Sequence, residues 1–308
     1  MSKVIELINS REFTSIKDKI LPLLKSSIRV RTISVPEEKI EIGTSKIGGS
    51  PDLPRDLDWP ECNRLPLSFI AQFNLSELST YNEDNTLPSS GMLYIFYDTI
   101  RVIIHDYDEN YNEVSKIFYY NGDLSQLTRT PPPKQLVNIR GDLWDAGIFR
   151  ACAITFAKEK VLPESDSLYI SDLGLNDNEK ELYIRLIGEI SKLYNKKEDK
   201  MRRLPTYITH RLLGYSDGIN GSYMEYDCQL RLEGISWKEI FKGAFTKLDE
   251  SQKLKIKKEC INWRLLFQID SDYKAQTEWG DVGRIYFWIR NEALKKKDFS
   301  LIYALYQG

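Results

Sequence analysis

The sequence predicts an α+β protein with a mostly antiparallel sheet, flanked by a few helices. Segments with the alternation and composition of strands outnumber segments with helical spacing. Strands and helices do not alternate regularly along the chain, as they would in a protein built from βαβ units. Two segments, residues 67–98 and 263–290, share a pattern of strand, polar loop and strand. These three observations define the predicted fold class.

The first third of the chain predicts a helix, a strand and a long loop. Apolar residues recur at helical spacing over residues 3–27, where Pro22 breaks or kinks the helix. Residues 28–47 are rich in Val, Ile and Thr, which favour strands. Residues 48–66 contain too much glycine and proline for a regular element, so we expect an ordered loop there.

The two strand-loop-strand units align with each other at four positions. Gln72 matches Gln268, Asn74 matches Asp270, Gly91 matches Gly283 and Tyr94 matches Tyr286. The two intervening loops differ by about four residues, which costs little entropy. We interpret the similarity as an internal duplication, with pseudo-repeats over about 28–130 and 135–308. The alternative is a chance likeness between two amphipathic hairpins.

The rest of the chain adds short strands and helices within one predicted domain, residues 1–308. Strands are expected over residues 101–107, 114–121, 135–140, 149–162 and 299–306, with further strand and turn over 206–232. Helices are expected over residues 177–194, over 237–258 with an interruption, and near 292–296. Thr130-Pro131-Pro132-Pro133 predicts a stiff linker between the two pseudo-repeats.

Composition argues against several classes of partner. The chain has 308 residues and a net charge of −2, without a basic run interleaved with aromatic residues, so no nucleic-acid partner is expected. No apolar run approaches the roughly 20 residues that span a bilayer, and the N-terminus lacks the apolar core of a signal peptide. The four cysteines are scattered, which fits reduced thiols. We therefore expect a cytoplasmic protein that does not bind membranes.

Patterns for nucleophilic or zinc chemistry are incomplete. Residues 214–218 match the G-x-S-x-G nucleophile elbow, which requires a following helix and a later histidine. Turn residues follow Ser216 instead, and both histidines, His105 and His210, precede it. The spacing of His210, Cys228 and Cys260 fits no standard zinc site. No cofactor is expected.

The predicted ligand site lies on the polar faces of the two units. Strict alternation directs Leu67, Phe69, Ala71 and Phe73 to one face, and Trp263, Leu265, Phe267 and Ile269 likewise. If the halves pair about a pseudo-two-fold axis, one polar surface could contain Gln72, Asn74, Gln268, Asp270, Tyr286 and Trp288. Amides and aromatic rings suit recognition of a ligand or peptide. The alternative is that helices cover this face and the glutamines bond to backbone inside the protein.

The second unit also has an acidic loop. Asp270, Asp272, Glu278 and Asp281 lie within about twelve residues between two strands. Crowded carboxylates hold a cation or raise one another's pKa, so Asp270, Asp272 and Asp281 are candidate ligands for calcium or magnesium. Recognition of a cationic group is a second functional reading. The alternative is a solvated loop in which the carboxylates cap the backbone.

Several motifs together resemble the YwqG-like family, a bacterial family of unknown function. They are residues 47–54 (IGGSPDLP), Trp59-Pro60, residues 66–75 (PLSFIAQFNL), residues 266–272 (LFQIDSD) and residues 279–283 (WGDVG). The resemblance extends over nearly the whole chain. It implies a cytoplasmic α+β protein without an established activity or cofactor, and an immunity or accessory role beside toxins.

The sequence thus favours a non-enzymatic binding protein whose partner is an unknown protein or small molecule. A coherent set of nucleophile, base or metal ligands is missing from the patterns above. The alternative is a metal-dependent or small-ligand-binding enzyme that uses the acidic loop, residues 270–281.

Overall fold

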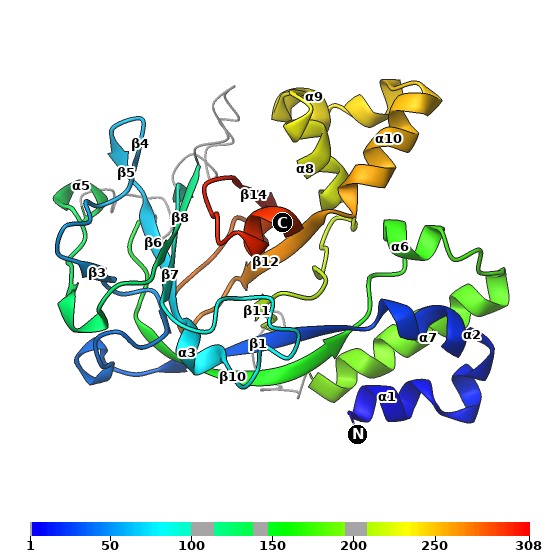
Figure 1. Cartoon of the computed structure of the whole chain (residues 1–308), viewed down its shortest axis with the longest axis horizontal. Helices are drawn as coiled ribbons and strands as arrows, with labels where there is room; N and C mark the ends of the chain where they lie inside the picture. The colour runs from blue at the N-terminus through cyan, green and yellow to red at the C-terminus, as the bar shows by residue number, and fades with distance from the viewer. Residues whose placement is uncertain (1, 100–113, 138–146, 195–207) are drawn as a thin grey trace.

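The computed structural model describes residues 2–99, 114–137, 147–194 and 208–308, and has the predicted α+β class (Figure 1). Ten strands form the main sheet: β1 (Lys25–Ser34), β2 (Lys46–Ile47), β6 (Ser68–Asn74), β7 (Met92–Tyr97), β8 (Ser115–Tyr120), β10 (Cys152–Val161), β11 (Arg211–Leu212), β12 (Trp263–Asp270), β13 (Arg284–Arg290) and β14 (Ile302–Gln307). Two small sheets pair β3 (Asp52–Pro54) with β9 (Leu127–Arg129), and β4 (Glu61–Cys62) with β5 (Leu65–Pro66).

The helices lie around this sheet. They are α1 (Lys3–Ile8), α2 (Thr14–Ile20), α3 (Leu75–Leu78), α5 (Lys134–Val137), α6 (Leu168–Ser171), α7 (Asp177–Tyr194), α8 (Met224–Leu232), α9 (Trp237–Phe241), α10 (Glu250–Cys260) and α11 (Asn291–Lys295). Single 3-10 turns occur at Arg11–Phe13, Leu21–Leu23, Glu37–Lys39, Leu124–Gln126 and Ala244–Lys247. None of the helices in the described ranges combines the length and hydropathy needed to cross a membrane.

The main sheet has a regular strand order, β14-β13-β12-β11-β1-β10-β2-β6-β7-β8. Read inward from its two edges, the order is β8, β7, β6, β2, β10 on one side and β14, β13, β12, β11, β1 on the other. At the centre, β1 and β10 are antiparallel over ten residues each, from the pair Lys25–Val161 to the pair Ser34–Cys152. The sheet curves so that Phe73 and Phe267 approach within 5.0 Å between ring centroids. Its concave side therefore encloses the main core.

A β-bulge interrupts both glutamine-bearing strands at the same place. The bulged residues are Ile70 in β6 and Leu266 in β12, each two positions before the glutamine. A bulge adds one residue and reverses the faces that follow it. Phe69 therefore packs with Tyr94 in a separate cluster, while Phe73 belongs to the main core. The strict alternation predicted for residues 67–73 and 263–269 is wrong for this reason.

Strongly periodic elements match their predictions. The helix over 177–194 is confirmed, and so are the interrupted helix over 237–258 and the strands over 114–121 and 149–162. The N-terminal helical segment consists of short pieces and gives way to β1 at Lys25. The strand expected over 101–107 lies outside the described residues.

Three segments differ from their predictions. Residues 48–66, expected as a loop without regular elements, contain the short strands β3, β4 and β5. Residues 206–232 were expected as strand and turn, but the described part contains a two-residue strand, β11, and the helix α8. Residues 134–137, where a strand was expected to begin, form α5. In α8 the buried positions include Glu225 and Gln229, which hide the apolar period of a helix.

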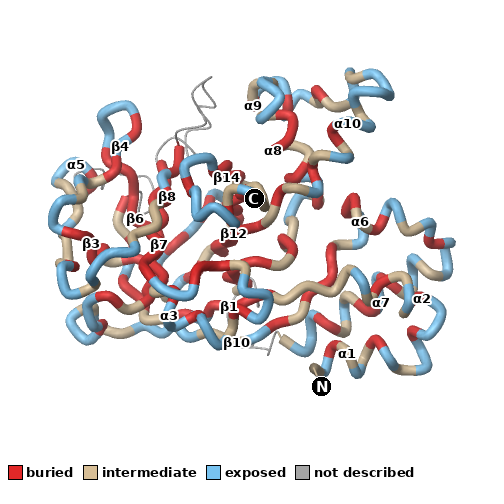
Figure 2. Tube along the Cα trace, viewed as in Figure 1, coloured by how far each residue is buried: buried red, intermediate tan, exposed pale blue. Residues whose placement is uncertain are grey.

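Figure 2 marks the buried residues in red along the chain, and the buried apolar residues among those described form three clusters. The largest lies between the curved sheet and helices α8–α10. The second joins α1 and α2 to α7 through residues such as Ile16 and Leu186. The third lies between β6, β7 and the strand β3, which contains Leu53.

Candidate functional site

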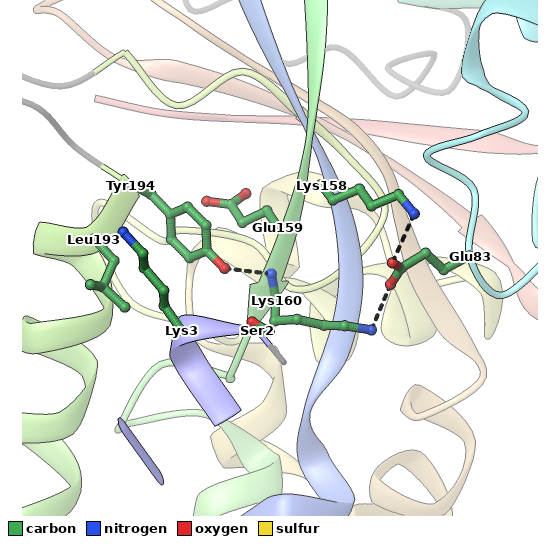
Figure 3. Close-up of a pocket in the computed structure, with 8 residues that line it drawn as sticks. All are labelled: Ser2, Lys3, Glu83, Lys158, Glu159, Lys160, Leu193 and Tyr194. Carbon is green, nitrogen blue, oxygen red and sulfur yellow. Dashed lines mark hydrogen bonds and ion pairs between the residues drawn. The ribbon is translucent and has the colours of Figure 1, made fainter. Parts of the chain in front are cut away.

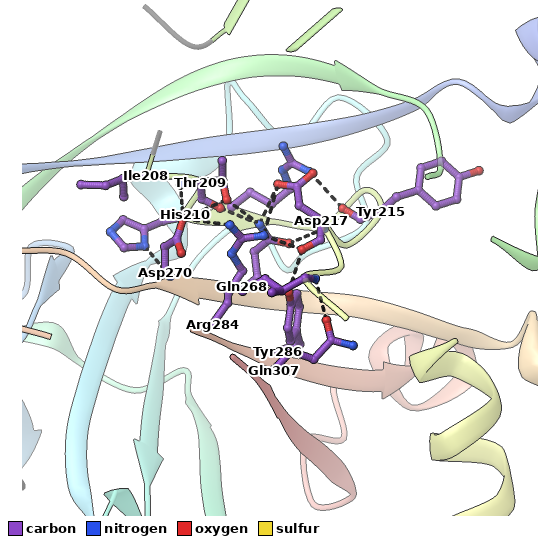
Figure 4. A network of polar contacts seen from close by, with 12 residues as sticks. Ile208, Thr209, His210, Tyr215, Asp217, Gln268, Asp270, Arg284, Tyr286 and Gln307 are labelled. Carbon is purple, nitrogen blue, oxygen red and sulfur yellow. Dashed lines mark hydrogen bonds and ion pairs between the residues drawn. The ribbon is translucent and has the colours of Figure 1, made fainter. Parts of the chain in front are cut away.

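Gln268 is at the centre of a buried polar cluster between β12 and the segment 209–217 (Figure 4). Its Nε2 donates to the backbone oxygen of Thr209 at 2.6 Å and to Oδ2 of Asp217 at 3.0 Å. Its Oε1 accepts the backbone N–H of Asp217 at 3.1 Å. On the adjacent strand, the hydroxyl of Tyr286 donates to the backbone oxygen of Asp217 at 2.7 Å. Gln268 and Tyr286 thus attach the loop around Asp217 to the sheet.

Paired charges surround this cluster. Glu159 accepts from Arg29 at 2.5 Å and from Arg211 at 3.1 Å, and Arg211 also donates to Asp217 at 2.7 Å. Arg284 donates to the backbone oxygen of Asp217. Burial raises the pKa of Asp217, but the three nearby guanidinium groups outweigh it and lower that pKa to about 2. The carboxylate therefore stays ionised at neutral pH and its charge is compensated internally.

Asp270 is buried and makes contacts on several sides. Its Oδ2 accepts the backbone N–H of Thr209 at 2.8 Å and the guanidinium of Arg284 at 3.0 Å. Its own backbone N–H donates to Nδ1 of His210 at 3.0 Å. These bonds occupy the carboxylate oxygen that faces the cluster.

His210 links Asp270 to the second loop carboxylate, Asp272. Because Nδ1 of His210 accepts a hydrogen bond, its Nε2 carries the proton and donates to Asp272 at 3.2 Å. The hydroxyl of Thr32 on β1 donates to the same carboxylate at 2.5 Å. Burial raises the pKa of Asp272, but the hydrogen bond from His210 and its further donors keep it below the ordinary value. The loop is thereby attached to the centre of the sheet.

The remaining acidic residues do not join these two. Glu278 and Asp281 are exposed, whereas Asp270 and Asp272 are buried and paired as described. Within the described ranges, no group of three or more histidine, cysteine, aspartate or glutamate residues could hold a metal ion. The metal role predicted for Asp270, Asp272 and Asp281 stays a prediction.

The first unit contains the same arrangement around Gln72. Its Nε2 donates to the backbone oxygen of Thr44 and to Oδ2 of Asp52, both at 2.7 Å, and its Oε1 accepts the backbone N–H of Asp52 at 2.8 Å. The hydroxyl of Tyr94 donates to the backbone oxygen of Asp52 at 2.6 Å. Lys46, which is fully buried, lies 3.5 Å from Asp52. Gln72 and Gln268 therefore have equivalent surroundings.

Asn74 also has a structural role. Its Nδ2 donates to the backbone oxygen of Gly43 at 2.8 Å, and its Oδ1 caps α3 by accepting the backbone N–H of Ser76. The backbone N–H of Asn74 donates to the hydroxyl of Ser45, as that of Asp270 does to His210. Asn74 and Asp270 thus bond alike through the backbone but differently through the side chain.

The structure does not bring the two glutamines together. Strands β2, β10, β1 and β11 lie between β6 and β12 in the sheet. Gln72, Gln268, Tyr286 and Trp288 are all buried, and Trp288 lies opposite Leu265 and Tyr303 in neighbouring strands. The alternative from the sequence, in which the amides bond inside the protein, describes these surroundings. A ligand-binding role for these residues stays a prediction.

The helices α8, α9 and α10, here called the helical arm, present a different surface. Local sequence signals set the start of two of these helices. A capping box begins α9, at Ser236 with Glu239, and another begins α10, at Asp249 with Gln252. The inner side of the arm packs against the sheet, where the indole N–H of Trp263 donates to Gln229 at 3.0 Å. Figure 1 shows the arm projecting from the sheet at the upper right.

The outer face of α10 combines apolar and basic side chains. Leu254, Lys258 and Ile261 follow helical spacing on the side opposite the buried Ile256 and Cys260. Leu254 is 67% exposed and Ile261 50%. The helices over 237–258 were predicted from the sequence, but this surface was not singled out. The available signal was an isolated leucine within the lysine-rich run 253–258.

Comparison with models of known families identifies the family of this chain. A family model described as a domain of unknown function (DUF1963) matches residues 45–307. The chain belongs to this family. The DUF1963 match includes both glutamine-bearing strands and both loops that they hold, and it begins after β1. No curated protein matches the chain. A family of unknown function was expected, and the YwqG-like name stays a prediction.

Proposed function

We propose that this DUF1963 member is a non-enzymatic, cytoplasmic binding protein that recognises an acidic protein segment through the helical arm. The observation that carries the proposal is the outer face of α10, with Leu254 and Ile261 exposed beside lysines. Large exposed apolar side chains on a monomer's surface favour a contact with another protein. In this proposal the buried glutamines position loops and do not touch the partner.

Charge specifies the chemistry of the partner. Residues 237–260 contain seven lysines and four acidic residues, although the whole chain has a net charge of −2. Three of these lysines pair internally: Lys253 with Glu250, Lys255 with Glu233 and Lys257 with Asp172. Lys258 forms no ion pair within the part of the chain that the structure describes. An amphipathic helix with carboxylates beside its apolar stripe complements such a face.

The resemblance to the YwqG-like family implies an immunity or accessory role. Binding of a partner protein through the helical arm would be the way in which the protein performs that role. An immunity protein acts by occupying a surface of its partner, so it needs an exposed, complementary face and no catalytic group. The outer face of α10 meets the first of these requirements.

Co-purification from the native host tests the proposal with matched variants. Leu254→Glu should remove an acidic partner that wild-type protein retains at low salt, and about 0.5 M salt should release it because surface charge is then screened. Ile184→Glu is the control, since Ile184 is 57% exposed on α7, away from the arm. Equal recovery of every bound protein with wild type and Leu254→Glu would contradict the proposal.

We also propose that the two halves arose by duplication of a five-strand unit. The support is the repeated set of contacts: a bulge before each glutamine, the same three amide bonds, and a tyrosine paired across the adjacent strand. In this scheme one unit consists of β1, β2, β6, β7 and β8, and the other of β10–β14. The first strand of each unit pairs with the second strand of the other, β1 with β11 and β10 with β2. Relatives in which only one half has the glutamine and aspartate would argue against a common origin.

A further inference from the structure

A cleft of about 370 Å³ lies where the end of α7 meets β10 and the start of α1 (Figure 3). Its charged lining residues are Lys3, Glu83, Lys158, Glu159 and Lys160, and Tyr194 closes one side. The volume is in the range of about 300–1,000 Å³ that is typical of small-ligand pockets. The cleft adjoins the charges around the Gln268 cluster through Glu159 and lies away from the helical arm.

Positive charge exceeds negative charge in this cleft. Glu83 pairs with Lys158 at 3.2 Å and with Lys160 at 2.7 Å, so one carboxylate neutralises part of two ammonium groups. Glu159 directs its carboxylate to Arg29 and Arg211, which compensate it inside the protein. Lys3 adds a third, exposed ammonium group at the rim. The ammonium groups of Lys158 and Lys160 therefore exceed the charge of Glu83 by one, and Lys3 lies on the other side of Tyr194 (Figure 3).

Fixed hydrogen bonds hold the lining in place. The ammonium of Lys160 also donates to the hydroxyl of Ser26 at 2.7 Å, and its backbone N–H donates to the hydroxyl of Tyr194 at 2.8 Å. Figure 3 shows the side chains of Lys158 and Lys160 both reaching Glu83 from β10. Glu83, Ser26 and Tyr194 hold Lys160 in place. Its ammonium group is therefore ordered before any ligand enters, which lowers the entropic cost of binding.

We propose that this cleft binds a small phosphate monoester. Lys158 and Lys160 present two ammonium groups side by side, and such groups bind phosphate oxygens as strong point-charge donors. Glu83 acts as an internal counter-ion that holds the two lysines when no ligand is present. This site is independent of the partner surface on the helical arm.

Titration with inorganic phosphate, followed by calorimetry and by melting temperature, tests the site in the full-length protein. Saturable binding is expected for the wild type, with a melting temperature that rises with phosphate concentration by mass action. Lys158→Gln should weaken binding by at least about tenfold, as the loss of a charge-assisted hydrogen bond would. Glu83→Gln should tighten binding, because the lysines lose their internal competitor.

Controls separate this site from a general salt effect. Lys180→Gln, on the exposed side of α7, should leave the affinity unchanged. The side chain of Lys158 is 55% exposed, so Lys158→Gln should fold, and its melting temperature without phosphate checks this. An equal, non-saturable response of all variants would overturn the proposal, as would unchanged or weaker binding by Glu83→Gln. Tighter binding of succinate than of phosphate would overturn the choice of a phosphate ligand.

Discussion

Gln72 and Gln268 illustrate how one buried amide can attach a loop to a sheet. Each side chain satisfies the backbone N–H and the carboxylate of an aspartate and a backbone oxygen of a threonine. An aliphatic side chain of similar size could offer none of these bonds. The buried aspartate groups would then lose partners without gaining water.

Replacing either glutamine by leucine should therefore destabilise the protein. We expect Gln72→Leu and Gln268→Leu each to lower the free energy of unfolding by about 2–4 kcal/mol, because buried donors and acceptors lose their partners. Urea denaturation measures the two losses. A loss below about 0.5 kcal/mol for either variant would show that its loop does not depend on the amide.

Glu225, at the start of α8, predicts a specific pH dependence. Burial raises its pKa to about 7, and Lys25 only partly offsets this. A carboxyl group with a raised folded pKa favours folding most below its unfolded pKa of about 4.3, and that contribution is lost as pH rises through about 7. Glu225→Gln should thus be more stable than wild type at pH 8, by on the order of 2–3 kcal/mol.

Thermal denaturation at pH 4.5 and pH 8 checks this prediction. The difference between Glu225→Gln and wild type should nearly vanish at the lower pH. Glu250→Gln serves as the control, because the side chain of Glu250 is 85% exposed and only a small effect is expected. A constant difference at both pH values would show that ionisation of Glu225 is not its cause.

For single residues, the sequence predicts which positions of the two units correspond to each other, but not their hydrogen-bond partners. The alignment of Gln72 with Gln268 and of Tyr94 with Tyr286 is matched by equal cross-strand pairs. Their corresponding partners, Asp52 and Asp217, lie about 20 and 50 residues earlier, at the start of the short strand β3 and in the loop after β11, where the course of the chain depends on tertiary packing. Local patterns contain no information about such contacts.

Among the elements, the turn after β2 depends on glycine. Gly49 has a φ of +72°, and a Cβ there would meet the Glu37 carboxylate and lie 2.7 Å from the Cβ of Ala151. Gly174 has a φ of +60° but open space around it. An alanine at either position would therefore have an unfavourable φ, but only at Gly49 would its Cβ also clash with neighbouring atoms.

Alanine at these two positions should have unequal effects. Gly174→Ala should cost about 1 kcal/mol, the usual penalty for a left-handed alanine. Gly49→Ala should cost clearly more, because the carboxylate of Glu37 that accepts from Ser50 must also shift. Circular dichroism melts of the two variants measure the contrast. Equal melting temperatures would mean that the chain around Gly49 relaxes freely.

Elements differ in how well the sequence predicts them. The helix α7 is long, amphipathic and correctly bounded, because tertiary contacts reinforce its local pattern. The bulges at Ile70 and Leu266 escape prediction, since one inserted residue leaves composition unchanged and only reverses faces. The helix α8 escapes it because buried polar residues interrupt its apolar period.

For the whole molecule, the second group of buried residues behaves as a separate unit. It joins α1, α2 and α7, and it contains none of the residues that fill the curved sheet. Leu186→Ala should cost about 2–5 kcal/mol by leaving a cavity in this group. Hydrogen exchange should then show faster exchange in α1, α2 and α7, while β12 and β13 keep most of their protection. Uniform acceleration across the chain would contradict two separable units.

The central position of β1 has a consequence for synthesis. Its pairing partner β10 follows more than a hundred residues later along the chain. At typical translation speeds this strand waits on the order of ten seconds for its neighbour. Until then the backbone N–H and C=O groups on this edge of β1 lack their partner strand, so the yield in the cell should depend on chaperones that bind at the tunnel exit.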